Sequence, residues 1–485
     1  MNSRKILIPL FLTCFVFATA LMNCSKKEEP VLRAYDAKNH NMIVLTGKQT
    51  KTNNFYEKAD FVVVGGSLGG IAAALALCSN GREVILVEES DKIAGCFAVE
   101  DTLSFAEGEL VEKTGSSRTY QIFRSKILDW YKKQSLSPPS IAPEFNPALG
   151  NFRFRNFCFG TEAALDVINE MLEKNRENGK LTVLYRHKIA KVTMFQNRIA
   201  SFIAIDLDKK VADMVSGWFF IDASVQGDLL VKAGIETVTG MESRSVTHEP
   251  HAPEKADSLV SQEFYICPYY KIEKKTKIGD QVSVYDVKKV NSPGNTGAYE
   301  FSVMTEPRRI ITETLISEED ISAENQKGQR AKFVKDSIGI GYTFITVNLP
   351  DGQRAFIETK PFQIPFGALI PIRFENVLAG NGNIGATYIA SSALNTPEIE
   401  WAIGEAAGTA AALLGGYKIT SQKFLSDPDK LRFFQRYLVK RFRAPIYWYD
   451  DVGPNDPDFV KAQLHPFENP AYHDSTRTLH YWQSK

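Results

Sequence analysis

The chain has 485 residues, with 57 basic and 57 acidic side chains and a hydrophobic content of 44%. This length supplies enough apolar material for two or three domains with a large core. The balanced charge gives no indication of nucleic acid or of an anionic surface as a partner, because proteins that bind them usually carry an excess of Lys and Arg. We therefore expect a globular protein with no nucleic-acid partner.

Residues 1–24 are predicted to be a targeting segment rather than part of the fold. Arg4 and Lys5 precede an apolar run, Ile6–Met22, which is short for a membrane span and typical of a bacterial signal peptide. The last residues of the segment are similar to a lipobox, in which Cys24 is lipidated and becomes the new N-terminus. Such a protein would be exported, periplasmic or on the cell surface, and anchored to the membrane by its lipid. An ordinary cleavage site and an uncleaved anchor are the alternatives.

The stretch from residue 60 to 89 predicts a strand, a glycine turn, a helix and a second strand. Phe61–Val64 is a short apolar run, as expected for a parallel strand that is buried on both faces. The turn Gly65-Gly66-Ser67-Leu68-Gly69-Gly70 follows and leads into a helix of small apolar residues. A second apolar run, Val84–Val87, ends at Glu88.

This pattern is typical of a site for the pyrophosphate of a dinucleotide. Glycines let the backbone approach the phosphates, and the N-terminus of the helix supplies free N–H groups. Glu88 lies where a carboxylate binds the adenosine ribose. In the G-x-G-x-x-G register, Ser67 replaces the second glycine, and its Cβ permits a less close approach. A glycine-rich turn in another α/β fold is the alternative interpretation.

Later segments repeat the pattern of a strand followed by a turn. Asp222–Asp228 follows an apolar run, and Asn376–Gly382 is an apolar strand that enters a glycine turn. Gly404–Ala412 is predicted to be a helix of small residues, and Leu181–His187 a strand leading to the apolar positions of Ile189–Val192. Because these units lie far apart in the chain, we expect one nucleotide-binding domain assembled from discontinuous pieces.

Cysteine and histidine do not form a metal-binding pattern. The six cysteines include no C-x-x-C pair, so neither an iron–sulfur cluster nor a structural zinc site is predicted. His248 and His251 are candidates for acid–base or metal roles, but Pro250 lies between them and no third ligand is evident. We expect a solvated loop there and no metal.

Three segments outside these units also have interpretable patterns. Lys271–Lys289 alternates Lys with β-branched residues, which predicts a solvent-facing hairpin in a cap. Leu431–Phe442 has helical spacing of apolar residues. The aromatic run Tyr447–Tyr449 is expected to pack on the main body, with contact to carbohydrate or cell wall as the alternative.

Several segments resemble the bacterial FAD-dependent oxidoreductase family with a glutathione-reductase-like flavin domain, some members of which are labelled xanthan-lyase-related. The resemblance covers about residues 60–413, with a gap at about 249–343, and residues 445–463 resemble the start of a surface-layer-homology-like module. The segments that carry it are EESDKIAGCF (88–97), GSSRTYQIFRSKILDWY (115–131), FNPALGNFRFRNFCF (145–159), DASVQGDLLVKAGI (222–235), IPFGALIPIRFENVLAGNGNIGATYIA (364–390) and EWAIGEAAGTAAAL (400–413).

The resemblance implies an α/β fold. Its main part would be a Rossmann-like FAD-binding domain of the three-layer ββα, glutathione-reductase type, built from discontinuous segments. An inserted α+β cap or substrate domain and a short C-terminal helical tail would complete it. The expected boundaries are 1–24 for the signal peptide and lipobox, 25–55 for a linker, 56–110, 180–240 and 360–418 for the FAD-binding domain, 111–179 and 241–359 for the cap, and 419–485 for the tail.

The resemblance also implies FAD as the cofactor. The start of a helix at Gly404-Glu405 would face the pyrimidine edge of the flavin, where a helix N-terminus stabilises the negative charge of the reduced ring. Cys96 near the flavin is a candidate for a covalent tether, although an inert buried cysteine is more frequent. The residues expected to bind the cofactor are Gly65, Gly66, Ser67, Leu68, Gly69, Gly70, Glu88, Glu89, Gly95, Cys96, Ala190, Ala223, Ser224, Gly227, Asp228, Gly382, Gly404 and Glu405.

The implied function is that of an exported oxidoreductase, which transfers hydride or electrons between FAD and a small organic molecule, carbohydrate-like molecules included. The electron donor or acceptor and the catalytic residues are not predicted; Tyr388, Arg373 and Arg118 are candidates for the substrate pocket. A surface-anchored binding protein on a degenerate flavin scaffold is one alternative, favoured by the departures from the family pattern at Ser67, Ala94 and Asn395. A dehydrogenase that uses only a nicotinamide cofactor is the other alternative, although such an enzyme would not need the segments Asp222–Asp228 and Gly380–Gly408.

Overall fold

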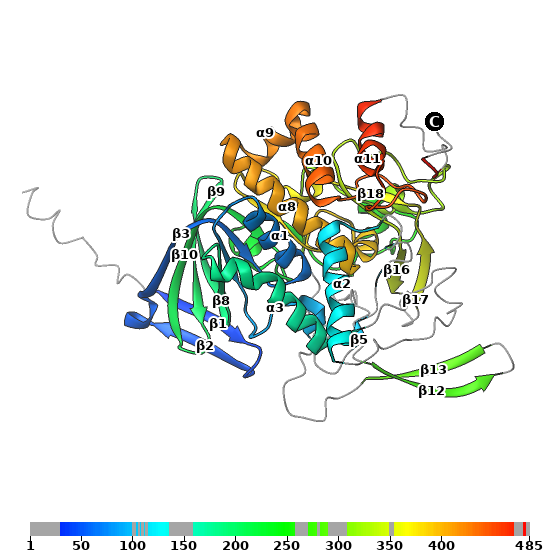
Figure 1. Cartoon of the computed structure of the whole chain (residues 1–485). Helices are drawn as coiled ribbons and strands as arrows, with labels where there is room; N and C mark the ends of the chain where they lie inside the picture. The colour runs from blue at the N-terminus through cyan, green and yellow to red at the C-terminus, as the bar shows by residue number, and fades with distance from the viewer. Residues whose placement is uncertain are drawn as a thin grey trace, which may run out of the picture.

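A seven-stranded mixed sheet organises the molecule (Figure 1). Five of its strands run parallel, and the apolar runs of all but the edge strand β7 are buried on both faces, as is typical of parallel strands. They are β7 (Leu181–Leu184), β4 (Val84–Val87), β3 (Thr52–Val64), β10 (Val211–Asp222) and β19 (Val377–Ala379). The computed structural model describes residues 30–98, 103–104, 107, 111, 115–134, 159–257, 270–278, 282–289, 308–348, 354–469 and 479–481.

The long strand β10 forms antiparallel pairs in one part of its length and parallel pairs in another. Its first half, 211–216, pairs antiparallel with β9 (Arg198–Asp206), which in turn pairs with β8 (His187–Phe195). Its last residues, 220–222, pair parallel with β19 instead. The sheet therefore passes from an antiparallel meander to a parallel sheet within one strand, and the α/β class predicted from the sequence is confirmed.

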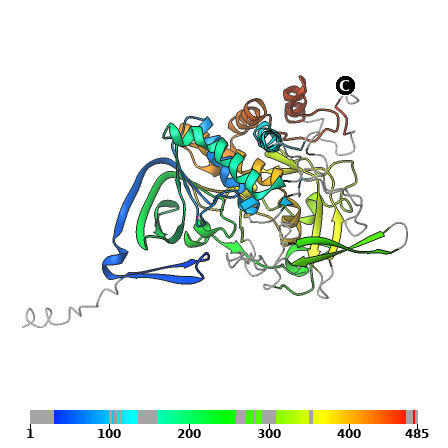
Figure 2. The same ribbon diagram turned by 60° about the horizontal axis from the view of Figure 1, so that its bottom comes forward.

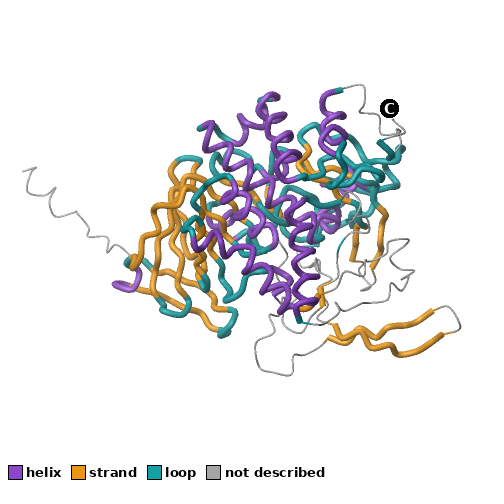
Figure 3. Tube along the Cα trace, in the orientation of Figure 1, coloured by secondary structure: helices purple, strands orange, loops and turns teal. Residues whose placement is uncertain are grey.

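The helices α1 (Leu68–Ser79) and α8 (Pro397–Tyr417) cross at very short distance beside the sheet (Figures 1 and 3). A Cβ added to Gly404 would lie 1.9 Å from the carbonyl oxygen of Gly69. One turn further on, a Cβ on Gly408 would lie 2.4 Å from the carbonyl oxygen of Ala73. Small residues on both helices are thus required by the contact itself.

Two more helices pack in the same layer. They are α2 (Arg118–Lys133) and α3 (Thr161–Glu177), and α3 leads directly into β7. Their apolar residues, among them Phe123 and Ile168, are buried in the same core as the central sheet. This part of the chain was assigned to the cap from the sequence, whereas the structure places its helices on the cofactor domain.

The N-terminal part of the predicted linker is a folded hairpin. Residues 31–46 form β1 (Val31–Asp36) and β2 (Asn41–Thr46), which pair antiparallel and lie at the end of the meander in both ribbon views (Figures 1 and 2). Leu32, Ala34, Ile43 and Leu45 alternate with exposed residues and bury one face of the hairpin against the meander. The linker prediction is therefore wrong from residue 31, and β3 begins at Thr52 rather than near residue 61.

The remaining elements are mostly short. Residues 270–278 and 282–289 pair as the two antiparallel strands of the predicted hairpin, and the predicted helix at 431–442 is the larger part of α10. The elements are β5 (Leu103–Ser104), β6 (Phe159–Gly160), α4 (Asp228–Lys232), β11 (Thr237–Val238), α5 (Arg244–Thr247), β12 (Tyr270–Ile278), β13 (Val282–Lys289), β14 (Arg309–Ile310), α6 (Glu318–Ile321), β15 (Ser337–Gly341), β16 (Phe344–Asn348), β17 (Arg354–Glu358), β18 (Phe362–Pro365), α7 (Tyr388–Ser391), α9 (Ser421–Ser426), α10 (Pro428–Phe442) and α11 (Phe459–Glu468).

The C-terminal aromatic run packs inward, as expected. Tyr447 and Tyr449 are buried, and the guanidinium of Arg330 lies 4.6 Å and 5.1 Å from their ring centroids. Arg330 also donates to the carbonyl of Trp448 at 3.0 Å. Within the described part of the chain, no helix combines the length and apolar character needed to cross a membrane.

The crossing of α1 and α8 gives a test with a built-in control. We expect Gly408→Ala to lower the free energy of unfolding by about 1–3 kcal/mol, because its Cβ would overlap the backbone of Ala73. Gly416→Ala in the same helix meets nothing closer than 3.8 Å, so it should be neutral or stabilise by up to about 1 kcal/mol. Chemical denaturation of the two variants measures both effects, and equal stabilities would contradict the close crossing.

Candidate functional site

The turn between β3 and α1 is built from contacts that only glycine permits. Gly65 has a φ of +97°, and a Cβ there would lie 2.4 Å from the backbone nitrogen of Ser224. A Cβ on Gly70 would lie 1.9 Å from the carbonyl oxygen of Gly65. The turn is therefore folded tightly on itself and on the end of β10, which leaves the backbone and the first turn of α1 as the lining of a cradle.

Ser67, the departure from the glycine fingerprint, has a clear structural role. It is the N-cap of α1, with φ at −66°, and its Oγ accepts a hydrogen bond from Gly70 N at 3.2 Å. Serine is a favoured N-cap because its oxygen satisfies a backbone N–H that the helix leaves open. Gly95 packs over it, since a Cβ on Gly95 would lie 3.1 Å from Ser67 Cα. The substitution is thus accommodated in the turn.

Glu88 lies at the tip of β4 and is tied to the same turn. Its Oε2 accepts from Gly66 N at 2.6 Å, and its Oε1 accepts from Ser90 N at 2.8 Å. Burial raises the pKa of Glu88, and the charge of Glu89 acts in the same direction, while the two backbone hydrogen bonds oppose them. Each carboxylate oxygen keeps a further acceptor site, as binding of ribose hydroxyls requires.

The end of β10 is held by a buried carboxylate. Asp222 accepts hydrogen bonds from Ser224 N at 2.9 Å, Ser224 Oγ at 2.6 Å and Leu230 N at 3.0 Å. Burial raises the pKa of Asp222 to about 6, although these hydrogen bonds favour the charged form. Ala223 and Ser224 are thereby fixed against Gly65, and Gly227 adopts a φ of +62° as the N-cap of α4.

Lys188 is a cradle residue that the sequence analysis missed. Its ammonium forms an ion pair with Glu89, and a second with Asp228 at 2.7 Å. Desolvation lowers the pKa of Lys188, but the two carboxylates outweigh it and raise the pKa above its ordinary value. Lys188 therefore joins the ends of β4 and β10, which are far apart in sequence, and the predicted residues Glu89 and Asp228 meet through it.

The turn after β19 completes the cradle. Gly380 N donates to the carbonyl of Asp222 at 2.8 Å, and Asn383 Nδ2 donates to the same oxygen at 3.0 Å. The carbonyl of Gly380 would lie 2.0 Å from a Cβ on Gly69. Next to it, the buried Oδ1 of Asn381 has no hydrogen-bond partner among the described residues, so an acceptor is available at this edge. Gly382 packs against Asn395.

The prediction that a helix starts at Gly404 is wrong. α8 begins at Pro397, with Thr396 as its N-cap, and Gly404 is an interior residue that lets α8 approach Gly69. Glycine in a helix interior is unfavourable by about 1 kcal/mol unless packing requires it, and here the close crossing does. The free N–H groups of the helix therefore lie near Thr396, about 10 Å along the axis from Gly404.

Glu405 contacts the start of α2. Thr119 donates a hydrogen bond to its Oε1 and accepts one from Trp401 Nε1 at 2.8 Å. Burial raises the pKa of Glu405 to about 8, although hydrogen bonds from Thr119 and Ser117 oppose the shift. Its Oε2 is buried and has no partner among the described residues.

Two further residues that were predicted to bind the cofactor are Ala190 and Cys96. Ala190 lies on β8 where the register against β9 shifts, and it packs against the core beneath the N-terminal hairpin. Cys96 belongs to the short helical turn Gly95–Ala98, but its side chain is outside the described part of the structure. Whether Cys96 tethers the cofactor therefore stays a prediction.

The two histidines singled out in the sequence are separated. His248 is exposed, with φ at +61°, in agreement with a solvated loop. His251 instead contacts the buried Glu318, with 2.5 Å between Nδ1 and Oε1. Of the pocket candidates, Tyr388 is buried beneath Arg309, whereas Arg373 and Arg118 are exposed.

Taken together, the glycine cradle, the carboxylate at the tip of β4 and the mixed sheet define a dinucleotide-binding α/β protein of the flavoenzyme class. The chain belongs to the FAD dependent oxidoreductase family, whose model matches residues 60–299 and 304–432. The cofactor is FAD, as predicted, and the oxidoreductase class predicted from the sequence is confirmed. A search of curated protein sequences finds no significant match.

Among solved structures, the chain is similar to several flavoenzymes at low identity. They include the 3-ketosteroid-Δ4-(5α)-dehydrogenase of Rhodococcus jostii RHA1 (13% identity, 37% of this chain and 47% of that chain, TM-score 0.24). The p-nitrophenol 4-monooxygenase PnpA of Pseudomonas putida DLL-E4 is another (13% identity, 39% of this chain and 46% of that chain, TM-score 0.26). A third is the glycerol-3-phosphate dehydrogenase of Bacillus halodurans complexed with FAD (12% identity, 43% of this chain and 45% of that chain, TM-score 0.23). The chain thus covers less than half the length of each.

The residues of the cradle fit FAD. A Cβ at Gly65, Gly69 or Gly70 would overlap neighbouring backbone, so this turn has the compact form that pyrophosphate binding needs. Glu88 has acceptor sites left for the ribose. Asn381 Oδ1 is a buried acceptor whose unmet hydrogen bond a ligand donor would satisfy.

The raised pKa of Glu405 predicts a pH-dependent stability. The folded chain holds this proton up to about pH 8, whereas the unfolded chain releases it near the ordinary pKa of 4.5. The unfolded state thus binds fewer protons between about pH 4.5 and about pH 8, so the contribution of Glu405 to stability falls across this range as pH rises.

In Glu405→Gln this fall should disappear, which makes the variant gain stability relative to the wild type as pH increases. Denaturant unfolding of both chains at a series of pH values measures the difference. The exposed Glu319→Gln serves as the control, and its curve should run parallel to that of the wild type. A parallel curve for Glu405→Gln as well would contradict the buried neutral carboxyl.

Proposed function

We propose that this protein transfers hydride or electrons between bound FAD and a small organic substrate, with carbohydrate-like molecules among the candidates. The observation that carries the proposal is the glycine cradle, in which β3, α1, β10, β19 and α8 meet through contacts that exclude a Cβ. FAD, when bound, supplies the hydride chemistry itself, so the protein needs to bind, orient and manage protons.

The cradle residues divide these tasks. Gly65–Gly70 and the first turn of α1 would hold the pyrophosphate, and Glu88 the ribose. The N-terminus of α8 at Thr396, rather than Gly404, would stabilise negative charge on the reduced ring. The hydroxyl of Thr396 supports this assignment, because it is buried and has no partner within the described residues. Glu405 would hold a proton at neutral pH.

The visible absorption spectrum of the purified full chain tests the proposal. We expect the bands of oxidised flavin, release of FAD on denaturation, and bleaching when a substrate reduces the flavin. Colour that remained on the denatured chain would favour the tether at Cys96. A colourless chain that also failed to take up added FAD would overturn the proposal.

A matched pair of variants ties that result to the cradle. Gly65→Ala and Gly81→Ala both place alanine at a positive φ, +97° and +78°, so both carry a similar backbone strain. Only the first adds a clash, since nothing lies within 4 Å of a Cβ on Gly81. We expect at least about 100-fold weaker FAD binding for Gly65→Ala alone. Equal effects of both variants would assign the loss to strain rather than to the cradle.

We further propose that the protein is exported and anchored by a lipid on Cys24. The support is the sequence of residues 1–24, which lies outside the described residues, and the folded hairpin that starts soon afterwards at Val31. Fractionation of producing cells tests the proposal. The wild type should sediment with membranes, and Cys24→Ser should lose lipid incorporation and shift to the soluble fraction. Equal behaviour of both would rule out the lipid anchor.

A further inference from the structure

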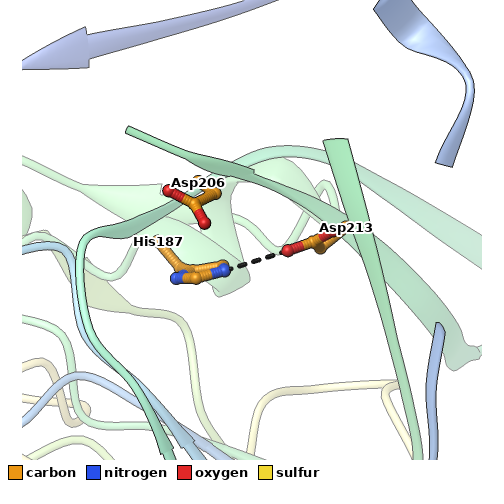
Figure 4. Close-up of side chains that lie close together, drawn as sticks. All are labelled: His187, Asp206 and Asp213. Carbon is orange, nitrogen blue, oxygen red and sulfur yellow. Dashed lines mark hydrogen bonds and ion pairs between the residues drawn. The ribbon is translucent and has the colours of Figure 1, made fainter. Parts of the chain in front are cut away.

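A buried cluster of three ligating side chains lies in the antiparallel meander, apart from the cradle. His187 begins β8, Asp206 ends β9 directly opposite it, and Asp213 lies on β10. Their exposed fractions are 7%, 3% and 0%. One potential ligand atom from each lies within 4.8 Å of the others, and Figure 4 shows the ring of His187 pointing at Asp213 with Asp206 beside it.

The hydrogen bonds of His187 bring its Nε2 close to a buried carboxylate. Nδ1 lies 2.6 Å from the carbonyl oxygen of Tyr185, which can only accept, so Nδ1 carries a proton. In a neutral ring Nε2 then presents a lone pair, yet it lies 3.1 Å from Oδ2 of Asp213. A lone pair facing a carboxylate is repulsive unless a cation lies between them. A proton shared between the two atoms, on the ring or on the carboxyl group, removes this repulsion, and so does a metal ion bound to both.

We propose that the cluster binds a divalent transition-metal ion of the Zn²⁺ type. One imidazole and two carboxylates are a ligand set that such ions accept, with a water molecule as the fourth ligand. Metal-bound histidine typically donates its other N–H to a carbonyl, which is the contact that His187 makes with Tyr185. In a tetrahedral site, ligand atoms lie about 3.4 Å apart. The Nε2–Oδ2 separation of 3.1 Å is close to this value.

The remaining contacts of Asp206 show what the ion must displace. Oδ1 accepts from Asp208 N at 3.0 Å and from Lys209 N at 2.9 Å, which holds the carboxylate in place. Oδ2 contacts the ammonium of Lys209 at 2.9 Å. The side chain of Lys209 is 70% exposed, so its ammonium can move into water when a metal ion takes its position. Lys209 is therefore a competitor of the metal.

The position of the cluster gives the metal a structural role. His187 lies between Arg186, which pairs with Asp36 of the hairpin at 2.8 Å, and Lys188, which joins Glu89 and Asp228 at the cradle. A metal on His187 would fix β8 between these two ion pairs. It would lie outside the flavin site, so its binding is measurable independently of FAD.

The test uses the full chain after treatment with a chelator. Calorimetric titration with Zn²⁺ should reveal one saturable site, with a rise in Tm that Mg²⁺ does not produce and with no change in flavin absorbance. His187→Asn should weaken Zn²⁺ binding by at least about 100-fold. His465→Asn, which removes a half-buried histidine of α11 outside the cluster, should bind as the wild type does. Lys209→Ala should bind at least as tightly.

Two results would overturn the proposal. One is the absence of a saturable Zn²⁺ site in the wild type, together with a Tm that a chelator does not change; a proton shared between His187 and Asp213 would then join the two side chains. The other is equal Zn²⁺ binding by the wild type and His187→Asn, which would place the metal elsewhere. If His187→Asn does not fold, Asp213→Asn takes its place, and the chelator experiment on the wild type decides by itself.

Discussion

The structure depends on a set of backbone contacts too close for any side chain. At the β3–α1 turn, Gly65 lies against the end of β10, Gly69 against Gly380 and Gly404, and Gly70 against Gly65. Van der Waals contact at this range leaves no room for relaxation, because the neighbouring atoms are backbone rather than flexible side chains. The same contacts bring the helix N-terminus, Glu88 and the turn after β19 together, so the shape of the cofactor site follows from the packing of the core.

Ion pairs and charged contacts at the start of β8 also connect separate elements of the fold. The consecutive residues Arg186, His187 and Lys188 each contact carboxylates from other elements: the hairpin, the meander and the cradle respectively. Buried pairs of this kind contribute little net stability, but removing one partner leaves an uncompensated charge. Their effect is to fix how separate elements are positioned, which the apolar core alone specifies less sharply.

The sequence predicted the parts of the site that are local. Gly65–Gly70, Glu88 and Asp222–Asp228 were recognisable because strand, turn and helix follow one another within a few residues. Gly404 was predicted to start a helix at the flavin, whereas it lies inside α8, where a glycine is needed for close packing on Gly69. Lys188 and the cluster at His187 could not be predicted, because their partners come from strands whose register only the fold determines. The hairpin at 31–46 was missed although its apolar residues alternate, because a charged segment precedes it.

The discontinuity of the cradle has a consequence for the order of synthesis. Gly65 and Glu88 leave the ribosome early, whereas Gly380 and α8, which close the site, follow only after some three hundred further residues. Contacts between such distant segments form late, since a long loop must first be closed. FAD therefore has no complete binding site on a nascent chain. A chain that crossed a membrane unfolded would reach the other side without FAD. The completed polypeptide must then bind free FAD in the compartment in which it folds.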